Sequence, residues 1–235
     1  MDRKQNLPLL AGLLGALFWI AADMLLVGFV PRPEAWPLFS QTLRSRLDPN
    51  MAMLMLDGSA TRLIWGICLA TLSVVLYVSA VPGLRRLMPG GWSGTIPTAL
   101  LFYGYVTSPV GHAGFGYVGL QAQSIAASGP EVMDAQVLAF NQFVWILQLH
   151  WLVSVLASAA GWLLLFAMTL AGRSALARWN AITNPIVLAP LTGALCAQFP
   201  ERLAAALLGC SSLNIAQAIF FAVALTAPEK PETGL

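Results

Sequence analysis

The chain has 235 residues, of which 58% are hydrophobic and only 9% are charged, and its formal net charge is +2. Soluble domains are about 25% charged, so these few charges cannot cover a water-facing surface, and the high hydrophobicity excludes intrinsic disorder. The basic residues are scattered, which excludes a nucleic-acid partner, and the composition therefore predicts an integral membrane protein.

Six apolar runs approach the length of about 20 residues that a membrane-spanning helix requires. In chain order they cover residues 7–29, 63–81, 96–120, 140–171, 186–199 and 203–226. The third run contains Pro97 and Pro109, and the fifth is short and contains Pro190, so the fifth can be a thin or broken span. We therefore predict an all-α polytopic membrane helix bundle of about six transmembrane helices. It forms a single domain over residues 1–228, followed by a polar tail at 229–235.

The distribution of basic residues predicts the orientation in the membrane. An even number of spans places both termini on one side, and Lys and Arg near the span ends favour the cytoplasmic side. The side of the termini carries Arg3, Lys4, Arg85, Arg86, Arg173, Arg178 and Lys230, whereas the opposite side carries Arg32, Arg44, Arg46, Arg62 and Arg202. The first group is slightly larger, which predicts cytoplasmic termini.

The loop between the first two apolar runs, residues 31–61, is not a simple linker. Trp36, Phe39 and Leu43 alternate with polar residues, and a methionine- and leucine-rich stretch follows at 51–56. Such a segment is expected to lie in the membrane interface or to cap the helix bundle.

Asp23 in the first run is the leading candidate for a functional residue. Ionisable groups inside a membrane are costly and often functional, and Asp23 lies roughly 10 Å below the outer boundary at 1.5 Å per residue. Gly12, Ala16, Trp19 and Asp23 share one helical stripe, and its small residues allow a neighbouring helix to approach closely. We therefore expect Trp19 and Asp23 to face the bundle interior. There Asp23 either takes part in chemistry or only hydrogen-bonds another helix.

His112 in the third run is the second candidate. It shares a stripe with Tyr105, Ser108 and Gly116, in a segment rich in glycine. Pro109 frees a backbone carbonyl, and such a backbone is suited to lining a cavity rather than facing lipid. His112 is therefore either a catalytic residue in a cavity or a buried histidine bonded to a partner.

Further polar residues lie in or beside the later runs. Asn214 lies near mid-membrane in the sixth run, where it can hydrogen-bond Asp23 or His112, or simply join two helices. Arg62 begins the second run, where it can reach a lipid phosphate or pair with Asp23. Asn184 and Pro185 predict the N-cap and first position of the fifth helix. Taken together, the candidate substrate contacts are Trp19, Arg62, Tyr105, His150, Asn214 and Gln217.

Sequence signatures of catalysis and metal binding are missing. The chain has no HExxH, GxSxG or P-loop motif, and its two histidines, His112 and His150, are too few for a metal site. Cys68, Cys196 and Cys210 lie in apolar runs without CxxC spacing, which is typical of packing residues. We therefore predict neither a metal nor a cofactor.

Several segments together carry a resemblance to a known family. They are GALFWIAADMLL at 15–26, TRLIWG at 61–66, the glycine-rich segment around His112, NPIVL at 184–188 and SLNIA at 212–216. In this order they resemble an uncharacterised family of small bacterial six-helix membrane proteins, a domain of unknown function. The resemblance implies a protein of the bacterial inner membrane, and it supplies no activity and no catalytic residue.

Three functions remain open, and whether the chain is an enzyme is undecided. The favoured one is an integral membrane enzyme acting on a lipid or isoprenoid-like small molecule in an outer-leaflet pocket. Asp23 and His112, within about 4–6 Å or bridged by water, would act as an acid–base pair. The second is a small proton-coupled transporter, favoured by a polar path to both faces and a hinge in the third run. The third is a non-catalytic scaffold or lipid-binding partner, favoured if every cavity is smaller than roughly 300 Å³.

Overall fold

The structure is a computed structural model that describes residues 3–226, with side chains from residue 6 onward. The predicted tail at 229–235, Lys230, and the side chains of Arg3 and Lys4 lie outside the described residues. Within the described range every regular element is a helix, which confirms the all-α fold.

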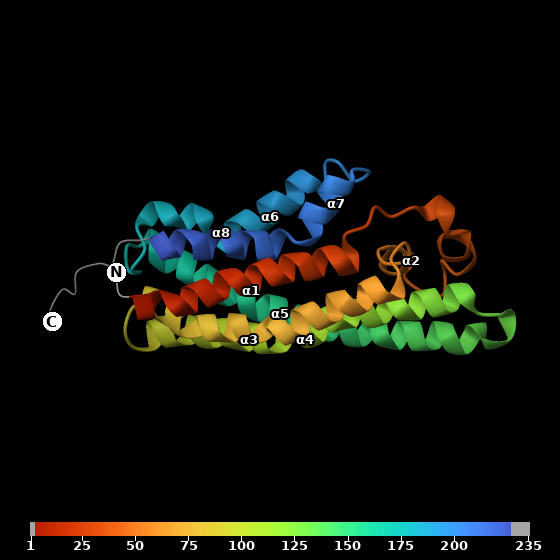
Figure 1. The fold of residues 1–235 in the computed structure, drawn as a ribbon, viewed down its shortest axis with the longest axis horizontal. Helices are drawn as coiled ribbons and strands as arrows, with labels where there is room; N and C mark the ends of the chain where they lie inside the picture. The colour runs from red at the N-terminus through yellow and green to blue at the C-terminus, as the bar shows by residue number, and fades with distance from the viewer. Residues whose placement is uncertain (1–2, 227–235) are drawn as a thin grey trace.

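The long helices alternate in direction along the long axis of the molecule (Figure 1). The helices are α1 (Arg3–Val27), α2 (Pro49–Met53), α3 (Ala60–Leu87), α4 (Trp92–Ala127), α5 (Met133–Leu170), α6 (Pro185–Cys196), α7 (Leu203–Cys210) and α8 (Ser212–Thr226). Short helical turns cover Pro33–Ala35, Leu38–Thr42, Pro130–Val132 and Arg178–Thr183. The start of α1 and the end of α8 lie at one end, called the terminal end, and the α4–α5 loop lies at the other, called the cap end.

Three helical segments in residues 3–226 are long and apolar enough to cross a membrane. They are Asn6–Val27, Ala60–Leu87 and Pro130–Leu170, and the bent pair α7 and α8 makes a fourth if it is counted as one span. The expected number of about six is therefore not reached by length and composition alone. α6 is an apolar helix of only 12 residues, and α4 is too rich in glycine and polar residues to qualify.

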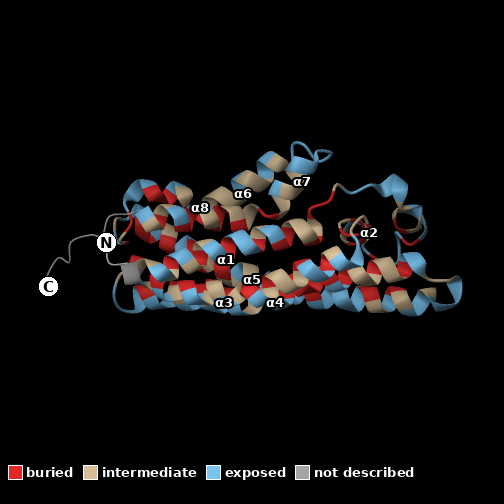
Figure 2. Ribbon diagram, viewed as in Figure 1, coloured by how far each residue is buried: buried red, intermediate tan, exposed pale blue. Residues whose placement is uncertain are grey.

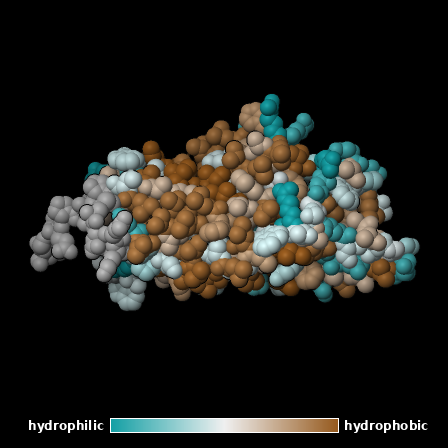
Figure 3. All heavy atoms as spheres, viewed as in Figure 1, coloured by the Kyte–Doolittle hydropathy of each residue, from teal (hydrophilic) through white to brown (hydrophobic). Residues whose placement is uncertain are grey.

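The apolar side chains on the outside of the bundle identify an integral membrane protein. Trp65, Leu72, Trp145 and Leu156 are among many large hydrophobic residues that are more than half exposed. Figure 3 shows such residues covering the middle of the molecule, while hydrophilic residues gather toward the cap end. A water-soluble monomer rarely exposes contiguous apolar area of this kind, so lipid is the natural surrounding of this surface.

Two helices run further than the apolar pattern predicts. α3 continues to Leu87, past the predicted run that ends at residue 81. A proline inside a helix removes only one backbone hydrogen bond, and Gly83 packs closely against Leu9 of α1. α4 remains unbroken through Pro97 and Pro109. The third run, in which a transporter hinge is expected, is therefore one continuous helix.

The predicted sixth span is not one straight helix. α7 and α8 meet at an angle of 64°. At the break the Ser211 hydroxyl donates to the Leu207 carbonyl at 2.7 Å, and the Cys210 thiol lies 3.2 Å from the same oxygen. Such side-chain bonds compete with the helical backbone pattern.

α6 begins as predicted, since the Asn184 side chain accepts the Ile186 N–H at 3.0 Å and Pro185 takes the first helical position.

The loop between α1 and α3 folds into a cap on the α4–α5 hairpin, as one of its two interpretations anticipated. Phe39 and Met55 are completely buried against Phe140 and its neighbours. The Arg32 guanidinium donates to both Asp57 oxygens, at 2.9 and 2.8 Å. Figure 2 shows buried positions running through the bundle into this region, so the cap is a packed extension of the fold.

Candidate functional site

A cavity of about 680 Å³ opens among α1, α3, α4, α5, α6 and α8. One wall carries polar and aromatic side chains from α1, α3, α4 and α8. The opposite wall, on α6, is apolar and small, with Ala189, Pro190, Gly193 and Ala194. The cavity therefore has one polar wall and one apolar wall, which suits a ligand that has a polar part and an apolar part.

Asp23 lies at the centre of the polar wall, on the inward stripe of α1 that the sequence predicts. Its Oδ2 accepts a hydrogen bond from Asn214 Nδ2 at 2.7 Å, and its Oδ1 lies 3.4 Å from His112 Nδ1. Asp23 and His112 are each 8% exposed. The two residues are therefore within the distance that acid–base cooperation requires, and Asn214 belongs to the same cluster.

Asn214 and Gln217 on α8 extend this cluster to two tyrosines. Tyr77 donates to Asn214 Oδ1 at 2.6 Å, and Tyr105 donates to Gln217 Oε1 at 2.8 Å. The two tyrosine rings stack with centroids 4.7 Å apart and planes 6° from parallel. The side chains of α1, α3, α4 and α8 thus form one continuous polar network along the cavity wall. The bend between α7 and α8 lies just before Asn214 and sets its direction.

Three ring nitrogens in the cavity wall are buried without a hydrogen-bond partner among the described residues. They are Trp19 Nε1, His112 Nε2 and Trp162 Nε1. The Trp19 and His112 rings also lie against each other, with centroids 4.9 Å apart. Buried polar nitrogens without a partner are costly, and a group of them around one cavity is a reason to expect a polar ligand there.

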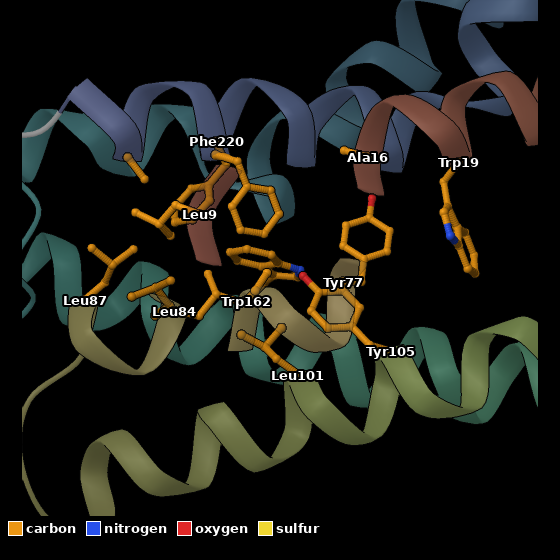
Figure 4. Packing of buried hydrophobic residues seen from close by; sticks show 14 of the residues in the cluster. Leu9, Ala16, Trp19, Tyr77, Leu84, Leu87, Leu101, Tyr105, Trp162 and Phe220 are labelled. Carbon is orange, nitrogen blue, oxygen red and sulfur yellow. The ribbon is translucent and has the colours of Figure 1, made fainter. Parts of the chain in front are cut away.

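The cavity is closed toward the terminal end by a buried aromatic and aliphatic cluster. Trp162 packs edge-on against Phe220 with centroids 4.7 Å apart. Figure 4 shows these rings next to Tyr77 and Tyr105, with Leu84 further toward the terminal end. All of these residues are at most 3% exposed, so the polar network ends at Tyr105 and Gln217.

The cavity reaches the outside of the bundle between α5 and α6. Trp151 on α5 and Pro190 and Ala194 on α6 line the cavity and are also exposed. α6 packs mainly against α8 and touches α5 at few points. The opening therefore faces sideways, toward the apolar exterior of the bundle.

The structure brings six of the eight predicted site residues to this cavity: Asp23, His112, Trp19, Tyr105, Asn214 and Gln217. His150 does not line it, because its Nδ1 bonds the Ile146 carbonyl of its own helix at 2.9 Å. Arg62 forms no ion pair with Asp23 and instead donates to the Met24 carbonyl at 2.5 Å. The second alternative for Arg62, pairing with Asp23, is therefore wrong in this structure.

Two residues of the wall were missed by the sequence reasoning, Tyr77 and Trp162. Tyr77 could have been found, since it continues a stripe of small residues on α3, Gly66, Ala70 and Ser73, all of which are buried. Trp162 gave no comparable signal within its long apolar helix.

The described part of the chain contains no group of three or more His, Cys, Asp or Glu side chains placed to hold a metal ion. The three cysteines are free thiols. Proton transfer through Asp23 and His112 is the chemistry for which this cavity has the groups.

Comparisons with curated proteins and with solved structures find no match. The model of one protein family matches residues 1–230, which is nearly the whole chain, and that family is described as a family of unknown function, DUF6796. This agrees with the resemblance to an uncharacterised family. The chain belongs to DUF6796.

Proposed function

We propose that this protein is a multi-pass membrane enzyme that acts on a lipid or isoprenoid-like substrate by acid–base chemistry. Asp23 and His112 are its catalytic residues, and the sideways opening between α5 and α6 is the way in. The observation that carries the proposal is the Asp23–His112 contact of 3.4 Å on the wall of a cavity of about 680 Å³.

Exposed aromatic residues support a position for the membrane. Trp92 lies at the terminal end of α4, and Tyr117 follows it by 25 residues on the same helix. At 1.5 Å per residue the two are about 38 Å apart, close to the spacing of the two interfacial belts of a bilayer. Trp65 and Trp145 are exposed near the level of Tyr117, since Gly116 packs against Ile67 and Gly114 against Leu147.

This placement puts the catalytic pair in the leaflet on the cap side. His112 precedes Tyr117 by five residues, or roughly 8 Å along the helix. The cap and the outer parts of α4 and α5 then extend beyond the membrane. Cytoplasmic termini, as the basic residues predict, make this the outer leaflet and the inner membrane of a bacterium the expected location.

We infer different roles for the two catalytic residues from their geometry. Asp23, held by Asn214, orients the His112 ring through Nδ1 and stabilises its protonated form. His112 then takes a proton at Nε2 from a substrate hydroxyl or a water molecule as that oxygen forms its new bond to the reacting centre, and it gives the proton to the leaving oxygen as the old bond to that centre breaks. A carboxylate that positions a histidine in this way is a recurrent arrangement in acid–base catalysis, and proton transfer of this kind contributes about 10²- to 10⁴-fold to rate.

The other two functions have less support. A scaffold requires no cavity, whereas this one exceeds the roughly 300 Å³ at the lower end for ligand pockets. A transporter requires a polar path to both faces, whereas Trp162 and Phe220 close the terminal side. The helix in which a hinge is expected, α4, is also continuous through both of its prolines.

The test is turnover in a membrane lipid extract. We expect the protein, reconstituted with that extract, to change one lipid species over time by mass spectrometry. Asp23→Asn and His112→Ala should each lower that rate at least ~100-fold. Asp134→Asn and His150→Ala are matched controls outside the cavity and should keep the rate. Full turnover in His112→Ala would show that the Asp23–His112 pair is not catalytic.

A further inference from the structure

We propose that Arg62 binds the phosphate of a lipid headgroup at the cap-side entrance, so that the ligand of the cavity is a phosphate-bearing lipid. This inference rests on the proposed function only for the claim that the bound lipid is also the substrate. The binding itself follows from the surroundings of Arg62, from a second hollow beside it and from its level in the membrane.

Arg62 is a half-buried cation held in a fixed position. Its guanidinium lies 3.9 Å from the centre of the Phe29 ring, and Nη2 donates to the Met24 carbonyl at 2.5 Å. Its Nε is buried and has no hydrogen-bond partner among the described residues, so a ligand reaches the guanidinium through Nη1 and the second N–H of Nη2. A guanidinium binds carboxylate or phosphate through two parallel hydrogen bonds, and its contacts with Phe29 and Met24 fix its orientation in advance.

Three aspartates on the cap side of the bundle have partners other than Arg62. Asp57 pairs with Arg32, and Asp134 pairs with Arg46 at 2.6 Å. Asp23 is held by His112 and Asn214. Within residues 3–226 no carboxylate forms an ion pair with Arg62, so the anion that suits this guanidinium is not supplied by the described chain.

A second hollow of about 400 Å³ has Phe29 in its wall, and Arg62 stacks on the Phe29 ring without itself lining the hollow. Its other lining residues include Pro31, Leu54, Ala205 and Ala206, and no charged side chain lines it. It shares Val27, Phe115, Gly193, Gly209 and Cys210 with the main cavity, so the two adjoin beneath α6 and α7. An apolar passage thus leads from the Phe29–Arg62 pair to the catalytic residues.

The level of Arg62 suits a headgroup rather than a chain. It precedes Trp65 by three residues on α3, which is about 5 Å toward the cap side of the aromatic belt. Lipid phosphates lie at this level, and the acyl or isoprenoid chain of such a lipid then points toward the cavity. A free phosphate ion has the same charge but would leave the passage and the cavity without an apolar occupant.

Lipid binding by the purified full-length chain in detergent tests this inference. Three probes are titrated and followed by native mass spectrometry: phosphatidic acid, diacylglycerol with the same chains, and inorganic phosphate. We expect saturable binding of phosphatidic acid, at least tenfold weaker binding of diacylglycerol, and no binding of phosphate alone. Equal binding of the two lipids, or binding of phosphate alone, would overturn the inference.

Variants separate the headgroup site from folding effects. Arg62→Gln should weaken phosphatidic acid binding at least tenfold, and Arg62→Lys should restore part of it because the charge remains. Arg44→Gln, at an exposed arginine of the cap, should change nothing. Ala206→Trp fills the second hollow, leaves the charge of Arg62 in place and should also weaken phosphatidic acid binding. Wild-type affinity in both Arg62→Gln and Ala206→Trp would contradict a headgroup site at Arg62.

These experiments distinguish a failure of the lipid-binding proposal from a failure of the enzymatic proposal. Asp23→Asn should still bind phosphatidic acid while losing turnover, since the headgroup contact does not involve the carboxylate. If wild-type protein binds the lipid but no lipid in the extract changes, the headgroup site stands and the enzymatic proposal falls.

Discussion

Asp23 is buried at the meeting point of three other helices. Its carboxylate contacts Asn214 of α8 and His112 of α4, and through Asn214 it is linked to Tyr77 of α3. A buried acid with one oxygen hydrogen-bonded to Asn214 and the other 3.4 Å from His112 Nδ1 is confined in its orientation, which is what a positioned catalytic group needs.

Asn214 should be important for stability as well as for the site. Asn214→Leu keeps the side-chain size but removes the donor to Asp23 and the acceptor for Tyr77, leaving buried polar groups unpaired. We expect a loss of about 1–3 kcal/mol in unfolding free energy, measured by denaturant unfolding in detergent micelles. Asn141→Leu changes the same residue type at an exposed position and should cost far less. Equal losses for the two variants would show that the network does not stabilise the fold.

The residues that share one face of a helix could be predicted, because helical periodicity determines which positions lie on the same side. Gly12, Ala16, Trp19 and Asp23 form such a face, and all four are buried. The pairing of Asp23 with His112 rather than with Arg62 depends on how helices rotate against one another. Periodicity within each helix carries no information on that rotation, so the alternatives stayed open until the helices were packed.

At the scale of elements, glycines bring α4 and α5 into close contact. A Cβ at Gly111 would lie 2.9 Å from the backbone of Trp151, and one at Gly104 would overlap the Ser158 side chain and lie 3.1 Å from the Ser154 carbonyl. Both α5 residues, Ser154 and Ser158, line the cavity. The spacing of these two helices therefore sets the width of one cavity wall.

Gly104→Ala tests this close contact. The added methyl group must push α5 away, and we expect a loss of about 1–3 kcal/mol in unfolding free energy. Gly90→Ala is the matched control, because a Cβ there would meet nothing within 4 Å. Thermal unfolding of both variants in the same detergent gives the comparison. A stable Gly104→Ala protein would mean that α4 and α5 are further apart than described.

The cap has its own electrostatic anchor. Hydrogen bonds from Arg32, and also from Trp36, lower the pKa of Asp57 below its ordinary value. The stabilisation by this carboxylate is present above its unfolded pKa of about 3.9 and is lost as the pH falls through the lower folded pKa. Asp57→Asn should therefore lower the melting temperature at pH 7, and its difference from wild type should shrink near pH 3. A difference that stays constant with pH would contradict an ionised Asp57 in the cap.

The residues at which the helices begin and end were harder to predict than the presence of the helices. The expected runs at 96–120 and 140–171 correspond to α4 and α5, but both helices begin or end several residues beyond these runs, where they pack against the cap. Hydropathy marks the lipid-exposed length of a helix and not its protein-covered extension. The bend at Ser211 escaped prediction for a related reason, since a serine inside an apolar run does not by itself break a helix.

The whole molecule combines a lipid-facing bundle, a packed cap on one side and a cavity that opens sideways between α5 and α6. The opening faces the apolar exterior, and in the membrane position proposed above Asp23 and His112 lie at the depth of the cap-side leaflet. Under that proposal a lipid reaches His112 without leaving the membrane. The terminal side is closed by Trp162 and Phe220.

Photo-crosslinking tests most directly whether this cavity receives a lipid. A phospholipid with a diazirine in its chain is activated in vesicles containing the protein, and the modified residues are mapped by mass spectrometry. The account predicts crosslinks to cavity residues such as Val155 and Leu213, reduced in Ala194→Trp, which plugs the rim, and unchanged crosslinks to Leu72 on the outside. Crosslinks confined to outward residues such as Leu72 would contradict the account.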